Sequence, residues 1–146
     1  MNPSRYLFIG ICAVCCLMLS TQFAYAQLKL ANGYASGQWY NPARDGEGFY
    51  VEVIGEGDNL QIAVAMYSYD EAGNQLWLVG SAGLHPNDTS REIQVILIEG
   101  PVWGTNYDPA DQDRTQFGHI VVQFPTCDSA LFTVSSDVAG LESGNY

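Results

Sequence analysis

The stretch LQIAVAMYSYDEAGNQLWLVG, from Leu60 to Gly80, contains the pattern that decides the fold. Apolar side chains recur at every second position on both sides of a short polar segment. Since alternate residues of a strand point to the same face of a sheet, this pattern predicts two strands, each with at least one buried face. Between them, Asp70 can accept hydrogen bonds from the turn backbone, and Gly73 tolerates a positive φ. The stretch therefore predicts an antiparallel hairpin.

The same period of two recurs along most of the remaining chain, and no helical stripe is found beyond the N-terminal segment. The predicted strands span residues 35–41, 48–55, 60–70, 75–84, 91–102, 117–124 and 129–136. Their connectors are short, except for residues 103–116, so each strand is expected to pair with the next. We predict an all-β fold, an antiparallel up-and-down meander of barrel-like form, with a β-sandwich as the alternative.

The first 26 residues are typical of a signal peptide. Arg5 precedes an uncharged apolar run from Tyr6 to Leu19, and Ala24-Tyr25-Ala26 is a small-x-small cleavage motif. The apolar run is shorter than the ~20 residues that cross a bilayer comfortably. The predicted organisation is a signal peptide, 1–26, followed by a single β-domain, 27–146. The domain is expected to be exported to the periplasm or the extracellular space, with no membrane insertion after cleavage.

Charge and cysteine content narrow the function classes. Residues 27–146 carry 16 acidic and four basic residues, a net charge of −12, which repels phosphate backbones and anionic lipid surfaces. Nucleic acid is therefore a poor partner for this chain.

Cys127 is the single cysteine after residue 26, so no disulfide can form within the domain. We expect Cys127 to be buried as a small hydrophobic residue; a covalent dimer through it is the alternative.

Several middle strands are apolar on both faces. Leu76 and Leu78 alternate with Trp77 and Val79, whereas an isolated barrel or sandwich has a polar outer face. Either residues 103–116 cover the outer face, or this face is an interface in a homo-oligomer.

Two motifs resemble a repeated pattern in uncharacterised exported proteobacterial β-domains. The matching residues of the first are Gly37, Trp39, Tyr40, Asn41, Pro42, Gly46, Gly48 and Phe49. Those of the second are Tyr67, Tyr69, Asp70, Gly73, Trp77 and Val79. The resemblance implies a β-domain and transfers no catalytic residue. Such domains commonly continue past a GSG-[SN]-Y stretch into a last apolar strand, whereas this sequence stops at ESGNY, which suggests a missing closing strand and an open sheet edge for a partner strand.

A shorter similarity concerns Gly37-Gln38-Trp39. In lipocalin- and avidin-like barrels, a G-x-W motif starts the first strand and its tryptophan plugs one end of the barrel. The similarity favours a barrel over a sandwich and implies that an eighth strand after Tyr146 would complete the barrel.

The sequence contains no motif of a known catalytic class. It lacks H-E-x-x-H, G-x-S-x-G and a phosphate-binding glycine loop, and we assign no catalytic residue. The favoured function is a non-enzymatic binding module for a small apolar or sugar-like ligand or for an envelope partner. A hydrolase that uses paired carboxylates and a structural module without a ligand are the alternatives.

Candidate ligand-binding residues lie on the connectors. Trp103 and Tyr107 belong to the long connector, and Tyr40 and Arg44 to the corner after the first strand. Binding residues concentrate on loops, and aromatic rings stack on sugars and flat apolar ligands. Trp39 and Trp77 are expected to fill the core instead.

The long connector also carries a candidate metal site. Asp108, Asp111 and Asp113 place three carboxylates within six positions, and carboxylate oxygens are ligands for Ca²⁺. The central glycine and terminal glutamate of an EF-hand loop are missing, so a solvated acidic loop is the alternative. No other cofactor is predicted.

Overall fold

The computed structural model describes residues 28–102, 104–139, 141 and 143–146. The predicted signal peptide, 1–26, lies outside these residues. Within them the strands are β1 (Gly37–Trp39), β2 (Gly48–Ile54), β3 (Gln61–Tyr69), β4 (Gln75–Gly83), β5 (Ser90–Glu99), β6 (Asp113–Thr126), β7 (Ser129–Ser136) and β8 (Gly144–Asn145). Three single-turn 3₁₀ helices accompany them: η1 (Leu30–Asn32), η2 (Gly57–Asn59) and η3 (Pro109–Asp111).

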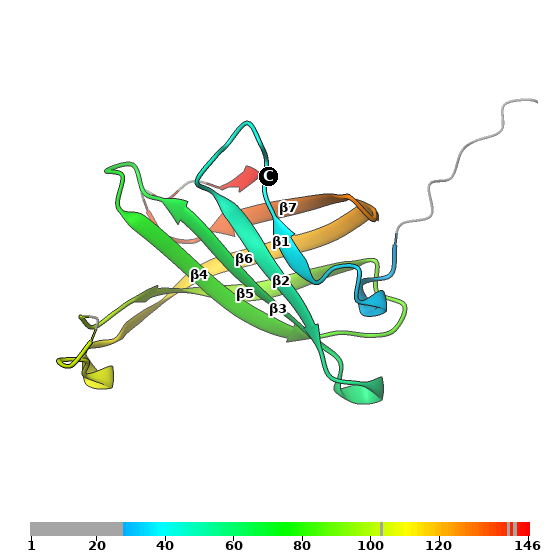
Figure 1. The fold of residues 1–146 in the computed structure, drawn as a ribbon, viewed down its shortest axis with the longest axis horizontal. Helices are drawn as coiled ribbons and strands as arrows, with labels where there is room; N and C mark the ends of the chain where they lie inside the picture. The colour runs from blue at the N-terminus through cyan, green and yellow to red at the C-terminus, as the bar shows by residue number, and fades with distance from the viewer. Residues whose placement is uncertain (1–27, 103, 140, 142) are drawn as a thin grey trace, which may run out of the picture.

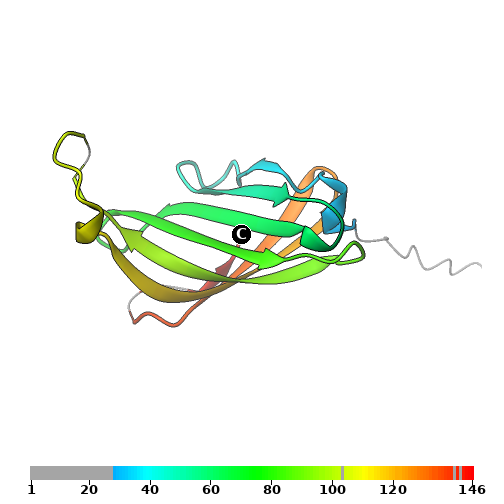
Figure 2. The same cartoon turned by 90° about the horizontal axis from the view of Figure 1, so that it is seen from below.

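Each strand pairs in antiparallel fashion with the next, so the described strands form one sheet in the order β1 to β8. The sheet curls into a half-barrel (Figure 1), and the view from below in Figure 2 shows the curl. The predicted all-β, barrel-like meander is confirmed. β1 and β8 are the two edge strands of this sheet.

The curl is concentrated between β4 and β5. These strands pair only through Leu78–Gly80 and Val95–Leu97. On its other side, β5 pairs with β6, and the register of that pairing shifts between Val95 and Ile96. A Cβ atom at Gly80 would collide with the carbonyl oxygen of Gln94, so the two backbones approach more closely than any other residue allows. Beyond this corner the sheet folds back, and β1–β4 cross in front of β5–β7 in Figure 1.

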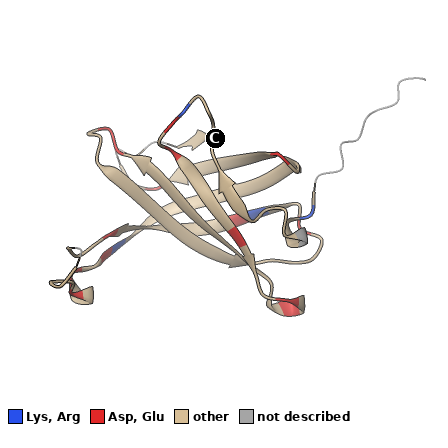
Figure 3. Cartoon of the chain, viewed as in Figure 1, with Lys and Arg blue, Asp and Glu red and all other residues tan. Residues whose placement is uncertain are grey.

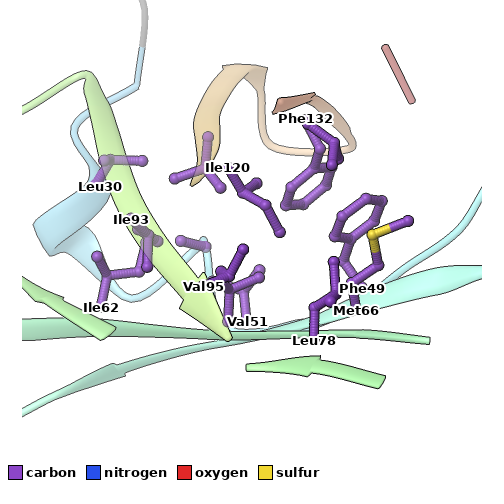
Figure 4. Close-up of a cluster of buried hydrophobic side chains, with 14 of the residues drawn as sticks. Leu30, Phe49, Val51, Ile62, Met66, Leu78, Ile93, Val95, Ile120 and Phe132 are labelled. Carbon is purple, nitrogen blue, oxygen red and sulfur yellow. The ribbon is translucent and has the colours of Figure 1, made fainter. Parts of the chain in front are cut away.

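The inward side chains of the two crossing layers form one core. Figure 4 shows side chains from both layers meeting there. Phe49 of β2 and Phe132 of β7 stack with ring centroids 3.9 Å apart and an angle of 2° between the ring planes. Because β2 and β7 lie near opposite edges of the sheet, this stack joins its two ends. Aromatic pairs contribute ~0.5–1.5 kcal/mol beyond the burial of their area.

The predicted β3–β4 hairpin is confirmed, together with its turn chemistry. Asp70 Oδ1 accepts hydrogen bonds from the backbone N–H groups of Ala72 and Asn74, at 2.9 and 2.8 Å. Gly73 has a φ of +84°, the left-handed conformation that glycine adopts without strain. Hydrogen bonds from Asn74, first from its side chain and then from its backbone, lower the pKa of Asp70.

Two strand predictions are wrong. β6 begins at Asp113 and not at residue 117. The prediction missed its first four residues because their side chains are exposed and polar and show no apolar alternation. These residues nevertheless pair with the end of β5. An eighth strand lies within the given sequence, where none was predicted: Gly144 and Asn145 pair with β7. A closing strand after Tyr146 remains a prediction. A two-residue strand that contains a glycine has no recognisable pattern.

The predicted burial of Trp77 and Cys127 is also wrong. Alternation directs Leu78 into the core and Trp77 outward, where it is 51% exposed and lies near Tyr67. Cys127 is exposed in the β6–β7 turn. Residues 104–116 do not cover the outer face at Tyr50 or Trp77, since both are exposed. The homo-oligomer interface and the covalent dimer remain predictions. Trp39 is partly buried against the core, as expected.

The corner at Gly80 generates a prediction about stability. Gly80→Ala should lower the free energy of unfolding by about 1–3 kcal/mol, because the new methyl group meets the backbone of β5. Gly83→Ala is the control, since a Cβ atom at this position has no neighbour within 4 Å. It should change stability by less than ~0.5 kcal/mol. Urea denaturation of both variants measures the difference, and equal stabilities would contradict the close approach.

Candidate functional site

A pocket opens where β1 and the loop after it face β7 and Tyr146, the residue after β8. Its volume is about 270 Å³, just below the range that is typical of ligand sites, ~300–1,000 Å³. Its lining includes Trp39, Tyr40, Arg44, Glu47, Phe49, Asp128, Ser129, Phe132 and Tyr146. Its walls thus come from both ends of the sheet, and the curl alone brings them together.

The aromatic walls are held by neighbouring contacts. The Trp39 indole N–H donates to the carbonyl oxygen of Ala35 at 2.9 Å, and its ring packs against Phe124 with centroids 4.8 Å apart. Phe49 contacts Phe132 by stacking and Tyr146 by its edge, at 5.7 Å between centroids. Tyr40 is 67% exposed at the rim. The pocket is therefore built on fixed rings, with one exposed ring at its mouth.

A chain of polar contacts ties the β1–β2 loop to β3. The Arg44 Nε–H donates to Glu47 Oε2 at 2.6 Å, and the buried Ser68 hydroxyl donates to Glu47 Oε1 at 2.9 Å. The Arg44 guanidinium also lies 4.5 Å from the centre of the Tyr146 ring. A second pocket of about 270 Å³ shares Arg44, Glu47 and Tyr146 with the first. These contacts separate two adjoining pockets.

The polar chain stabilises both of its charges. Burial raises the pKa of Glu47, but hydrogen bonds from Arg44 and Ser68 outweigh burial and hold this pKa below its usual value. The hydrogen bond to Glu47 raises the pKa of Arg44. At neutral pH the two side chains form an ion pair with no net charge.

Gly46 in the loop and Gly48 at the start of β2 make room for tyrosines of β3. A Cβ atom at Gly48 would collide with the Tyr67 hydroxyl group, which lies over it in the paired strand. Gly46 has a φ of +93° and lies against the Tyr69 ring. Asn41 Oδ1 accepts a hydrogen bond from the Ala43 backbone N–H at 3.0 Å and closes the turn. This loop geometry places Tyr40 and Arg44 at the pocket.

The structure brings together two of the four predicted ligand residues. Tyr40 and Arg44 line the pocket. Tyr107, 56% exposed, belongs to the β5–β6 connector, which lies away from the β1–β2 loop in Figures 1 and 2. Trp103 lies outside the described residues.

Two of the three predicted calcium ligands make other local contacts through their side chains. Asp108 caps η3 by accepting a hydrogen bond from Ala110, and Asp113 accepts one from the Arg114 backbone. In the part of the chain that the structure describes, no group of three His, Cys, Asp or Glu residues is placed to hold a metal ion. Asp108, Asp111 and Asp113 are therefore not gathered into a site, and calcium binding remains a prediction.

Sequence reasoning missed several residues of the site. Phe132, Asp128 and Tyr146 reach the pocket from distant parts of the chain, and no local pattern indicates this. The sequence pattern could have identified Ser68. It is a polar residue at an inward position of β3, on the same face as Ile62, Val64 and Met66. A buried hydroxyl needs a hydrogen-bond partner, and Glu47 provides it.

Comparison with protein families, with curated proteins and with solved structures found no match to this chain. Among the described residues, no helix has the length and apolar character needed to cross a membrane.

The Glu47 contacts predict a pH dependence. A carboxylate whose pKa is lowered by folding adds stability above its unfolded pKa, ~4.3, and loses this contribution as the pH falls through its folded pKa. Glu47→Gln should cost about 1 kcal/mol at pH 7, and the difference from wild type should shrink below about pH 4.

Urea denaturation at a series of pH values measures this difference. Glu52→Gln, at an exposed position of β2, is the control and should change stability by less than ~0.5 kcal/mol at pH 7. A Glu47→Gln curve parallel to that of wild type down to pH 3 would contradict the role of the carboxylate.

Proposed function

We propose that this chain is a binding module that holds a small, mainly apolar ligand in the pocket between the two ends of its sheet. The observation that carries this proposal is the meeting of five aromatic side chains, from distant parts of the chain, in one pocket. They are Trp39, Tyr40, Phe49, Phe132 and Tyr146. Small-molecule sites are concave and mostly apolar, with few polar groups that orient the ligand.

The polar groups of the pocket support binding over hydrolysis. A carboxylate pair in a glycosidase includes one acid with a raised pKa, which donates a proton. Here Glu47 accepts hydrogen bonds from Arg44 and Ser68, and its pKa is lowered. Glu47 is thus suited to holding the loop in place. Asp128 and Ser129 at the opposite wall supply acceptors and a donor for a bound ligand.

The proposal predicts that Tyr40 contributes to affinity. Neutral probes (indole, p-cresol and a methyl glucoside) are titrated while the indole N–H resonance of Trp39 is followed by NMR. At least one probe should shift this resonance, and Tyr40→Ala should weaken its binding about 5–10-fold, since one stacking ring is lost.

Tyr107→Ala is the matched control, because Tyr107 is similarly exposed but lies on the β5–β6 connector. It should leave affinity unchanged. If no probe shifts Trp39, or if both variants bind equally well, the pocket is not the binding site.

The outer face favours a second candidate function, association with a further copy of this chain. Tyr50, Tyr69 and Trp77 are exposed there. Beside them lies a depression of about 450 Å³, with Ala63, Ala65, Val79 and Ile96 in its lining. Exposed apolar patches of this kind mark interaction surfaces.

This second candidate predicts a dimer at high micromolar concentration in sedimentation velocity, which Trp77→Lys should convert to monomer. Wild type that sediments as a monomer throughout would rule it out.

A further inference from the structure

The ligand class of the aromatic pocket follows from its charges, provided that the pocket binds small ligands as proposed above. We propose that it accepts an organic cation, with a quaternary ammonium group as the class that fits best. The argument combines the electrostatics of the rings, the charged residues of the lining and the charge of the whole chain.

The rings of the pocket attract positive charge. The face of an aromatic ring carries negative potential, which attracts a cation within ~6 Å of its centre. One ring of this pocket already shows this behaviour, since the Arg44 guanidinium lies 4.5 Å from the centre of Tyr146. Trp39 and Tyr40 present further rings, partly buried and exposed respectively. Aromatic cages of this kind recognise methylated ammonium groups.

The charged lining leaves one negative charge for the ligand. The charged side chains of the lining are Arg44, Glu47 and Asp128. Arg44 and Glu47 form an ion pair at 2.6 Å, so their charges cancel at short range. Asp128 lies on the opposite side of the pocket, in the β6–β7 turn, where its Oδ1 accepts a hydrogen bond from the Thr126 hydroxyl. A cation between the rings would have this carboxylate as its counter-charge.

The charge of the whole chain acts in the same direction. The formal net charge is −11, and Figure 3 shows acidic residues spread over the loops and strand ends. Such a field raises the local concentration of cations and repels anions, while it does nothing for a neutral ligand.

The apolar walls distinguish among cations. A primary ammonium group is strongly hydrated, and its transfer into an apolar pocket leaves its three donors in need of acceptors. A quaternary ammonium group carries the same charge behind methyl groups, which pack against rings without hydrogen bonds. The pocket volume, about 270 Å³, suits a headgroup of this size better than a large ligand.

Choline and its neutral carbon analogue 3,3-dimethylbutan-1-ol test the inference, because they share shape and differ in charge. Both are titrated into the wild-type chain while the Trp39 indole resonance is followed. Choline should bind at least 10-fold more tightly than the alcohol. Raising the NaCl concentration from 20 to 500 mM should weaken the binding of choline and leave that of the alcohol unchanged.

Two variants test whether the preference for a cation arises from the Asp128 carboxylate. Asp128→Asn should reduce the affinity for choline about 3–10-fold without changing that for the alcohol. Asp111→Asn removes the same charge from the β5–β6 connector and should have little effect on either. Retention of the wild-type circular dichroism spectrum shows that the variants are folded. The salt dependence is measured on the wild-type chain and tests the inference even if a variant does not fold.

The outcomes separate this inference from the proposed function. Equal affinities for choline and the alcohol would overturn the cation inference and leave the apolar binding pocket standing. If choline and the alcohol both fail to shift Trp39 while indole or p-cresol shifts it, the cation inference alone is overturned. If no probe of any class shifts Trp39, both proposals fail.

Discussion

The stack between Phe49 and Phe132 is the interaction on which the rest of the structure depends. The two rings lie 3.9 Å apart, although they belong to β2 and β7, near opposite edges of the sheet. The described strands are ordered from β1 to β8, so backbone pairing alone leaves the sheet open. The corner at Gly80 allows the sheet to fold back, and the aromatic contact fixes how far it folds. Together with the contacts of Trp39 with Phe124 and of Phe49 with Tyr146, it sets the separation of the two walls of the pocket.

The pocket is therefore a consequence of incomplete closure. A sheet with continuous pairing around a barrel has no free edge, whereas here β1 and the loop after it meet β7 and Tyr146 through side chains. The ion pair of Arg44 and Glu47, with the Ser68 hydroxyl behind it, keeps the loop against β3. The same loop supplies Tyr40 to the rim. The residues that hold the structure together and those proposed to bind a ligand are thus neighbours on one short segment.

The parts of this structure that depend on neighbouring residues were predictable, and those that depend on curvature were not. Alternation predicted the β3–β4 hairpin, and Asp70 and Gly73 predicted its turn, because both signals lie within a few residues. Trp77 was misplaced because a strand with apolar residues on both faces does not reveal which face is buried. Tyr40 and Arg44 were identified from their loop. Phe132 and Tyr146 join them only because the sheet curls, which no local pattern encodes.

A double-mutant cycle on Phe49 and Phe132 tests the central claim most directly. The free energy of unfolding is measured by urea denaturation for Phe49→Leu, Phe132→Leu and the double variant. If the two rings stack across the open side of the sheet, the stability losses of the two single variants should add up to more than the loss of the double variant. The difference, the coupling energy, should be about 0.5–1.5 kcal/mol. Additivity within ~0.3 kcal/mol would mean that the rings do not touch, and would contradict both the closure and the pocket built on it.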